Sequence, residues 1–284
     1  MCRRIFMKKY YYVVMIFIFG IICAELTDYV ICSSYHIKEN LVETMEFRNL
    51  NIKDSVLSES KQIAENRNYD FAKILTVNYL GSDGHLNRLK FRGKNIKQEE
   101  KAYIQFCNDD YQKVSQGFAA IFNDLKYFPV AKSKVGSDWV GYDNSFGADR
   151  NFNGAYKHEG CDIMAEKNVS GYYPIVSVTD GVIENIGWLP KGGYRVGIRS
   201  NHDGYFYYAH LSSYTNIKKG DSIKAGTLLG YMGDTGYGEE GTKGKFDVHL
   251  HFGIYIQTEH YDELSVNPFW VLKYLENHVL YADY

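Results

Sequence analysis

The sequence lacks a surplus of charge of either sign. Its 284 residues include 32 Lys and Arg against 34 Asp and Glu, which gives a formal net charge of −2 at pH 7. A protein that binds nucleic acid usually has a basic surplus or a concentrated basic stripe. The charge balance therefore argues against this class of protein, and we expect no nucleic-acid partner.

Cysteine is sparse, and its spacing is irregular. A disulfide framework needs an even set of cysteines at regular spacings, whereas this set is odd and two of its members lie in or before an N-terminal apolar run. We therefore expect no disulfide. Internal repeats and low-complexity tracts are also absent, and the hydrophobic fraction of 45% is ordinary for a globular protein. The five cysteines are Cys2, Cys23, Cys32, Cys107 and Cys161.

One long apolar run is present, at residues 10–24. Four cations precede it within the first nine residues, and Glu25 and Asp28 follow it. Because positive charge stays on the cytoplasmic side of a membrane, everything after about residue 28 is expected outside the cytoplasm. No A-x-A-type cleavage site follows the run. We expect an uncleaved, single-pass membrane anchor over residues 1–27 in the cell membrane, and secretion after signal cleavage is the alternative.

Residues 28–130 are expected to form an extracytoplasmic α-helical region. Their first part, 28–60, is polar with scattered apolar positions, and we expect it to extend or coil away from the membrane. The stretch 55–83 predicts two short helices with a break near residues 66–68. A clearer helix follows, because its apolar positions step by four and three along one face, which predicts core packing. These positions are Cys107, Tyr111, Val114, Phe118, Ile121 and Leu125.

The character of the sequence changes near residue 130. Residues 131–156 are glycine-rich, polar and aromatic, as is typical of a linker. Short β-like runs then alternate with the turn signals TDG, PKGG and NHDG, without helical periodicity between them. This predicts an antiparallel β domain over residues 131–284, with a late helix that has Asn267 as its N-cap and Pro268 at its first position.

Three segments of this β domain carry histidines. HEGCDIMA places His158 and Asp162 four residues apart, and in an extended strand both would point the same way over an unobstructed glycine. YFYYAHL is a β-like run that ends near His210. DVHLHFGIY alternates apolar and polar residues, which is typical of a half-buried strand with His249 and His251 on its polar face.

These residue types fit a catalytic zinc site. Catalytic zinc typically takes three protein ligands, from imidazole nitrogen and carboxylate oxygen, and leaves its fourth position for water. His158, Asp162 and one histidine of the HLH pair would supply the ligands. The other histidine of the pair, with His210, would move protons near neutral pH. The residues alone leave open which member of the pair binds the metal.

The segment from about residue 158 to 275 resembles the lysostaphin-type (LytM-like) zinc endopeptidases, which cut peptidoglycan peptides. The motifs HxxxD, YxHL and HxH of that family stand here as HEGCD, YAHL and HLH, and GYMGDTG and VNPFWVLKYL add to the likeness. The resemblance implies a mainly β catalytic domain of antiparallel sheets, in a barrel or sandwich of the duplicated-hybrid-motif kind.

The resemblance also implies the roles of the site residues. One Zn²⁺ ion would be held by His158, Asp162 and His251, with His210 and His249 as catalytic histidines. In some members an upstream tyrosine stabilises the intermediate, but Phe152 stands six residues before His158, with Tyr156 nearby, and we assign that role to neither. Cys161 has the opposite parity to its neighbouring ligands, and we expect it to face the core.

The activity implied is hydrolysis of peptide bonds in peptidoglycan stem peptides or cross-bridges. Some family members have lost ligands and only bind partners. The alternative is therefore a non-catalytic binding or regulatory module of the cell envelope that uses the same groove to hold a partner. This chain keeps all five motif positions, which favours the enzyme. Residues 28–130 could block or recruit it, or bind an envelope protein.

Overall fold

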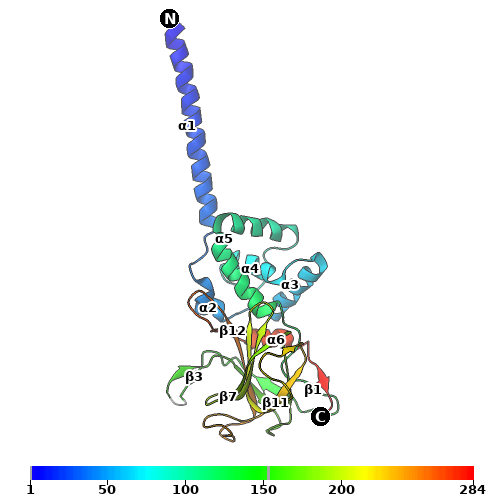
Figure 1. Ribbon diagram of the computed structural model, residues 1–284. Helices are drawn as coiled ribbons and strands as arrows, with labels where there is room; N and C mark the ends of the chain where they lie inside the picture. The colour runs from blue at the N-terminus through cyan, green and yellow to red at the C-terminus, as the bar shows by residue number, and fades with distance from the viewer. Residues whose placement is uncertain (1, 152–153) are drawn as a thin grey trace.

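The computed structural model describes residues 2–151 and 154–284. Figure 1 shows a long N-terminal helix, a layer of helices and, below them, a body built mainly of β-strands. The helices that precede the β body are α1 (Cys2–Ser34), the short 3₁₀ turn η1 (Leu41–Glu43), α2 (Met45–Arg48), α3 (Asp54–Arg67), α4 (Phe71–Leu80) and α5 (Lys94–Phe122).

Helix α1 projects from the rest of the molecule (Figure 1). Its segment Tyr10–Thr27 is long and apolar enough to cross a membrane, and none of that segment is buried against the protein. A signal sequence near the N-terminus would have the same properties. The uncleaved anchor over residues 1–27 therefore stays a prediction.

Residues 35–57 pack against the helical layer, so the expectation that residues 28–60 extend or coil away from the membrane is wrong for this part. The ring of Phe47 lies 4.9 Å from that of Phe118 on α5 and 5.6 Å from that of Tyr79 on α4, measured between centroids. The apolar positions look scattered because η1 and α2 are too short to show a helical period. Those buried in this segment are Ile37, Val42, Phe47, Leu50, Ile52, Val56 and Leu57.

The predicted break between two helices is confirmed. Helix α3 ends at Asn68, which adopts a left-handed conformation with φ 46°. Helix α4 begins after Asp70, whose carboxylate accepts a hydrogen bond from the backbone N–H of Lys73. The amphipathic helix is confirmed as α5, which buries its predicted stripe from Tyr111 to Ile121 and bends at Cys107, where the backbone is not helical (Figure 1).

The β body is a ten-stranded sheet whose strands all pair antiparallel, which confirms the predicted fold class. Along its main path the strand order is β10-β7-β8-β9-β12-β5-β2, with β11, β6 and β13 pairing off that path. The strands are β2 (Val140–Tyr142), β5 (Cys161–Ala165), β6 (Pro174–Val176), β7 (Gly181–Leu189), β8 (Gly193–Ser200), β9 (Tyr205–Tyr214), β10 (Ser222–Ile223), β11 (Leu228–Met232), β12 (His249–Ile256) and β13 (Leu264–Val266).

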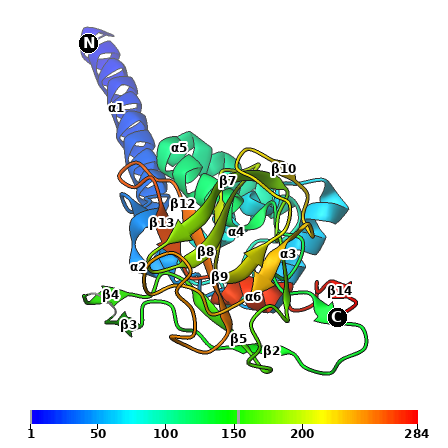
Figure 2. The same cartoon turned by 60° about the horizontal axis from the view of Figure 1, so that its bottom comes forward.

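Part of the segment expected to be a linker belongs to this sheet. Strand β2 pairs with β5, and two smaller ribbons lie outside the main sheet. Figure 2 shows one of them, the β3–β4 hairpin, at the opposite edge of the body from the other, β1 with β14. Their bounds are β1 (Lys132–Ser133), β3 (Asp149–Arg150), β4 (Tyr156–Lys157) and β14 (Tyr281–Ala282).

The central strand β12 has the alternation expected from its sequence. Leu250, Phe252 and Ile254 are fully buried, whereas the intervening positions face the other side of the sheet. Strand β12 lies between β5 and β9, so that His251 pairs with Asp162 on one side and Ala209 on the other. The register thus brings the three histidine-bearing segments of the sequence together.

The helical layer and the β body share one hydrophobic core. Arg48 at the end of α2 donates hydrogen bonds to the carbonyl oxygen of Ser265 at 2.8 Å and to its hydroxyl at 2.9 Å. The backbone N–H of Asn267 donates in return to the carbonyl of Arg48. Helix α6 (Phe269–Leu275) follows with Pro268 as its N-cap, one residue later than expected, and the side chain of Asn267 accepts from the N–H of Phe269.

Candidate metal and catalytic site

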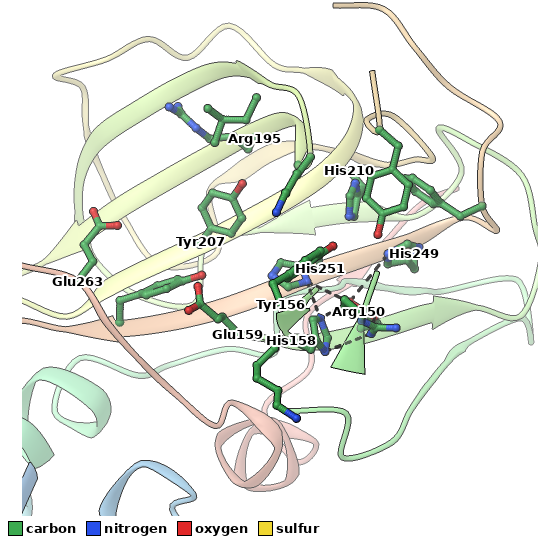
Figure 3. Close-up of a pocket in the computed structure, with 18 of the residues that line it drawn as sticks. Arg150, Tyr156, His158, Glu159, Arg195, Tyr207, His210, His249, His251 and Glu263 are labelled. Carbon is green, nitrogen blue, oxygen red and sulfur yellow. Dashed lines mark hydrogen bonds and ion pairs between the residues drawn. The ribbon is translucent and has the colours of Figure 1, made fainter. Parts of the chain in front are cut away.

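Three side chains converge where β5 and β12 pair. His158 Nε2 lies 2.9 Å from His251 Nδ1 and 3.0 Å from Asp162 Oδ1, and His251 Nδ1 lies 3.0 Å from the same carboxylate oxygen. These atoms all lie within 4.8 Å of one another, so one metal ion could contact all three. Figure 3 shows the two imidazoles turned toward each other in the groove.

The sequence predicted that His158 and Asp162 lie in one strand, but they do not. His158 precedes β5, and the chain bends at Gly160 between them. A Cβ on Gly160 would lie 2.6 Å from Cε1 of His251 and 2.7 Å from the carbonyl oxygen of Phe252. Glycine is therefore required here, because the ring of His251 occupies the space that any other side chain would enter.

The outer atoms of the cluster are held by polar neighbours. His158 Nδ1 lies 3.0 Å from the carbonyl oxygen of Ser145 and 3.2 Å from Arg150 Nη2, and its Nε2 faces the cluster. Arg150 Nη2 donates to Asp162 Oδ2 at 2.6 Å, which leaves Oδ1 turned inward. Such contacts orient metal ligands in proteins. Arg150, on the β3–β4 hairpin, belongs to no motif and was not predicted from the sequence.

The electrostatics of the cluster favour the protonation states of metal ligands. Burial by itself would raise the pKa of Asp162, but hydrogen bonds from His158 and His251 outweigh burial and hold that pKa well below its usual range. Burial lowers the pKa of His251 below its ordinary value, although Asp162 opposes that shift. An anionic carboxylate and a neutral imidazole result.

The donor set fits zinc. His158 Nε2, His251 Nδ1 and Asp162 Oδ1 point at one another. All three atoms have lone pairs that can bind a cation. Two imidazole nitrogens and one carboxylate oxygen with a fourth position open match the ligands of catalytic zinc.

The remaining two histidines lie beside this cluster. His249 Nδ1 is 2.7 Å from the carbonyl oxygen of Asp247, and His210 Nδ1 is 2.7 Å from that of Thr235. In each ring the Nδ1–H therefore donates to the backbone, and Nε2 is left as the proton acceptor. The two ring centroids are 4.7 Å apart, and His249 Nε2 lies 3.9 Å from Asp162 Oδ1.

His210 lies within β9, which continues past it to Tyr214. Its φ of 63° is left-handed, and the pairing of β8 with β9 shifts register at this point. Bulges of this kind redirect a side chain next to active sites. Burial, followed by the positive charge that its histidine neighbours would add, lowers the pKa of His210 well below its ordinary value, so this ring is neutral near pH 7.

A groove of about 910 Å³ runs past all five residues. Tyr156 on the β3–β4 hairpin reaches across to Tyr237, and burial together with this hydrogen bond raises the pKa of Tyr237 to about 12. Phe152 lies outside the described residues, and the role of an upstream tyrosine stays unassigned. Cys161 is fully buried and faces the core as expected, where burial raises the pKa of its thiol to about 12.

Comparison with known proteins gives concordant matches. The sequence model of peptidase family M23 matches residues 156–263. The L-Ala–D-Glu endopeptidase of Bacillus subtilis (strain 168) is 42% identical over 115 residues, which are 40% of this chain and 34% of that protein. Lysostaphin of Staphylococcus simulans is 39% identical over 82 residues, 28% of this chain and 15% of that protein. The chain thus spans about a third or less of these relatives' own length.

One solved structure is similar over nearly its whole length. It comes from Ruminococcus gnavus ATCC 29149 and is provisionally named a glycyl-glycine endopeptidase, LytM. Its sequence is 42% identical, its TM-score is 0.74, and the match covers 87% of this chain and 96% of the other. The similarity therefore includes the helical layer as well as the β body.

Proposed function

Because the chain belongs to peptidase family M23, we propose that it is a zinc endopeptidase that hydrolyses peptide bonds of peptidoglycan. The observation that carries this proposal is the convergence of two imidazole nitrogens and one carboxylate oxygen, with two further histidines beside them in one groove. In the proposed assignment His158, Asp162 and His251 hold one Zn²⁺ ion. His210 and His249 are the catalytic histidines.

The chain's own residues then have separate tasks. A bound zinc ion would supply Lewis-acid polarisation of the scissile carbonyl and activation of a water molecule. His249 Nε2 accepts a proton from the attacking water as its oxygen bonds to the carbonyl carbon. The C–N bond breaks, and His249 gives the proton that it accepted to the leaving amine. His210 remains neutral and holds its ring in place through Thr235.

The substrate class follows from the relatives. Their names indicate two chemistries, a bond between alanine and D-glutamate and a bond between two glycines. Peptidoglycan stem peptides and cross-bridges contain bonds of these kinds, and we propose them as substrates.

The location in the cell forms part of the proposal. Helix α1 would hold the groove outside the cytoplasmic membrane, where peptidoglycan lies, with secretion after signal cleavage as the alternative. Residues 28–130 would form the extracytoplasmic helical region and residues 131–284 the peptidase domain. The helical layer would be the surface for an envelope protein partner, if one binds.

Two measurements on the purified full chain in detergent test the proposal. Inductively coupled plasma mass spectrometry should find about one zinc per chain, and mass spectrometry should find peptides released from peptidoglycan. Removal of zinc with a chelator should stop release, and added zinc should restore it. A metal-free chain that releases nothing would contradict the proposal and favour the non-catalytic binding module.

A further inference from the structure

Arg195 is a groove-lining cation that has no counter-ion among the described residues. It lies on β8, half-buried, and its Nη1 is buried without a hydrogen-bond partner. Within the parts of the chain that the structure describes, its guanidinium forms no ion pair. Removing a charge from water without pairing it is costly, so arginine is rarely buried unless it is paired. A position of this kind is suited to an anionic ligand.

The other cations that line the groove are engaged. Arg150 is paired with Asp162, and Lys157 donates to Asp149 at 2.7 Å. The ammonium of Lys191 lies over the ring of Tyr156, 3.8 Å from its centroid. Among the described residues that line the groove, Arg195 is therefore the cation left for a ligand.

The aromatic neighbours of Arg195 do not neutralise it. Tyr205 and Tyr207 line the same part of the groove. Burial raises the pKa of both phenols above its ordinary value, although the charge of Arg195 opposes this shift. Both phenols are therefore neutral at physiological pH, where they can donate hydrogen bonds to an anion but cannot act as counter-ions.

The two acidic residues that lie at the same end of the groove also leave Arg195 unpaired. Glu159 and Glu263 are exposed to solvent, and Figure 3 shows Glu263 on the side of the groove where Arg195 and Tyr207 lie. Exposed carboxylates are well hydrated and gain little from a surface ion pair. Glu263 nevertheless is the acidic side chain that could compete for Arg195, which makes it the matched control.

The backbone of Arg195 lies on the strand next to the one that carries His210. Tyr194 pairs with Leu211 and Val196 pairs with Tyr208, so Arg195 stands opposite the bulge that contains His210. Neighbouring strands lie about 4.8 Å apart. On its other side Arg195 pairs with Gly187, where a Cβ would meet nothing within 4 Å, so the space beside it is open. One residue of an extended peptide spans about 3.5 Å. The backbone of Arg195 is therefore one strand away from that of His210, a separation of between one and two residues of an extended peptide.

We propose that Arg195 binds a free carboxylate of the peptide substrate, on the residue next to the scissile bond or the one beyond it. The inference rests on the proposed peptidase function and selects its substrate class. A glutamate inside a peptide uses one carboxyl group in the bond to the next residue and keeps the other free. A glycine bridge has no such group. The planar guanidinium can bind this carboxylate through two parallel hydrogen bonds, so the chain favours acidic peptides over glycine bridges.

The test compares two probes on the full chain in detergent. One is fluorescein-labelled L-Ala–γ-D-Glu–L-Lys amide, whose D-Glu α-carboxylate is free, and the other carries a carboxamide at that group. Equilibrium binding is measured by fluorescence anisotropy in the His249→Ala variant, in which turnover is slowed roughly 10²–10⁴-fold. The His249→Ala variant, which serves as the parent for the comparison, should bind the acid probe at least about 10-fold more tightly than the amide probe. A hydrogen bond to a charged group contributes about 1.5–3 kcal/mol.

Adding Arg195→Gln to the His249→Ala parent should lower the affinity for the acid probe to that for the amide probe. The affinity for the amide probe should not change. Arg195→Lys should keep part of the preference, and Glu263→Gln should keep all of it. The proposal is wrong if the parent binds both probes equally or if the preference survives Arg195→Gln. A loss of affinity for both probes alike would also overturn it, since that result indicates a structural role.

Cleavage by the unmutated chain is measured separately and decides the proposed function. A chain that prefers the acid probe but releases nothing from peptidoglycan would refute the peptidase function and leave the carboxylate site in place. A chain that cleaves peptidoglycan without preferring the acid would refute the carboxylate site alone.

Discussion

At the scale of single residues, the two histidines of the HLH pair have different surroundings although their chemistry is the same. His251 Nδ1 faces Asp162 and His158, whereas His249 donates from Nδ1 to the backbone. We predict that His251→Ala loses zinc. His249→Ala should keep zinc and lose roughly 10²–10⁴-fold in cleavage rate, as is typical for a removed general base. Zinc content and muropeptide release check both, and zinc retained by His251→Ala would contradict the assignment.

Arg150 gives a second prediction, because it holds the outer oxygen of Asp162. Arg150→Ala should weaken zinc binding roughly 10- to 100-fold, as removal of a residue that orients a metal ligand typically does. The matched control is Lys157→Ala on the same hairpin, which loses only an exposed ion pair with Asp149. Competition with a zinc-binding dye measures the affinities. Equal affinity in the two variants would show that Arg150 does not orient the ligand.

Gly160 gives a third prediction. In Gly160→Ala the new methyl group would collide with the His251 ring and with backbone. Such overpacking costs typically about 1–3 kcal/mol, and here it should also displace a proposed ligand. The control is Gly141→Ala on β2, where a Cβ would meet nothing within 4 Å. Urea unfolding and zinc content are the measurements, and a Gly160→Ala variant with parental values for both would refute the steric argument.

At the scale of elements, α2 is tied to β13 through Arg48 and Ser265. Burial lowers the pKa of Arg48, and its guanidinium satisfies both the carbonyl and the hydroxyl of that serine. Arg48→Ala should lower the free energy of unfolding by about 1.5–3 kcal/mol, the usual contribution of hydrogen bonds to a charged group. Lys113→Ala, which removes an exposed ion pair from α5 to Glu259, should change it little. Urea denaturation of both variants decides whether the α2–β13 contact stabilises the fold.

The elements also differ in how well the sequence predicts them. Strand β12 and helix α5 are long, and their apolar positions repeat with periods of 2 and about 3.6, so each was predicted from its own residues. Residues 35–57 were not, because short turns have no period and their burial depends on partners in α4 and α5. For the same reason β2 was expected to be linker: three residues become a strand only by pairing with β5.

At the scale of the whole molecule, the shared core predicts how truncated chains behave. Removal of residues 2–34 should leave zinc binding and cleavage unchanged, because none of the Tyr10–Thr27 segment is buried against the protein. Removal of residues 2–130 should expose the face of the β body that packs on the helical layer. We expect that fragment to melt at a lower temperature and to bind a hydrophobic dye. Identical melting of the two fragments would show that the β body folds independently of the helices.

The sequence by itself determined the class of chemistry and the type of fold. Alternation along DVHLHFGIY requires one buried face and one polar face, and the histidine and aspartate motifs supply the atom types that bind zinc. Those features are local, so they can be identified from the sequence without a structure. The same limit explains why the residues alone could not say which histidine of the pair faces His158 and Asp162.

Only the tertiary structure decided how these residues meet. The pairing of β12 with β5 and β9 sets His251 against Asp162, and the bulge opposite Arg195 turns His210 into the groove. Arg150 reaches Asp162 from a separate hairpin, and among the described residues none forms an ion pair with Arg195. Contacts of this kind depend on strand register and on packing between distant segments. Local patterns of residues predict neither of these.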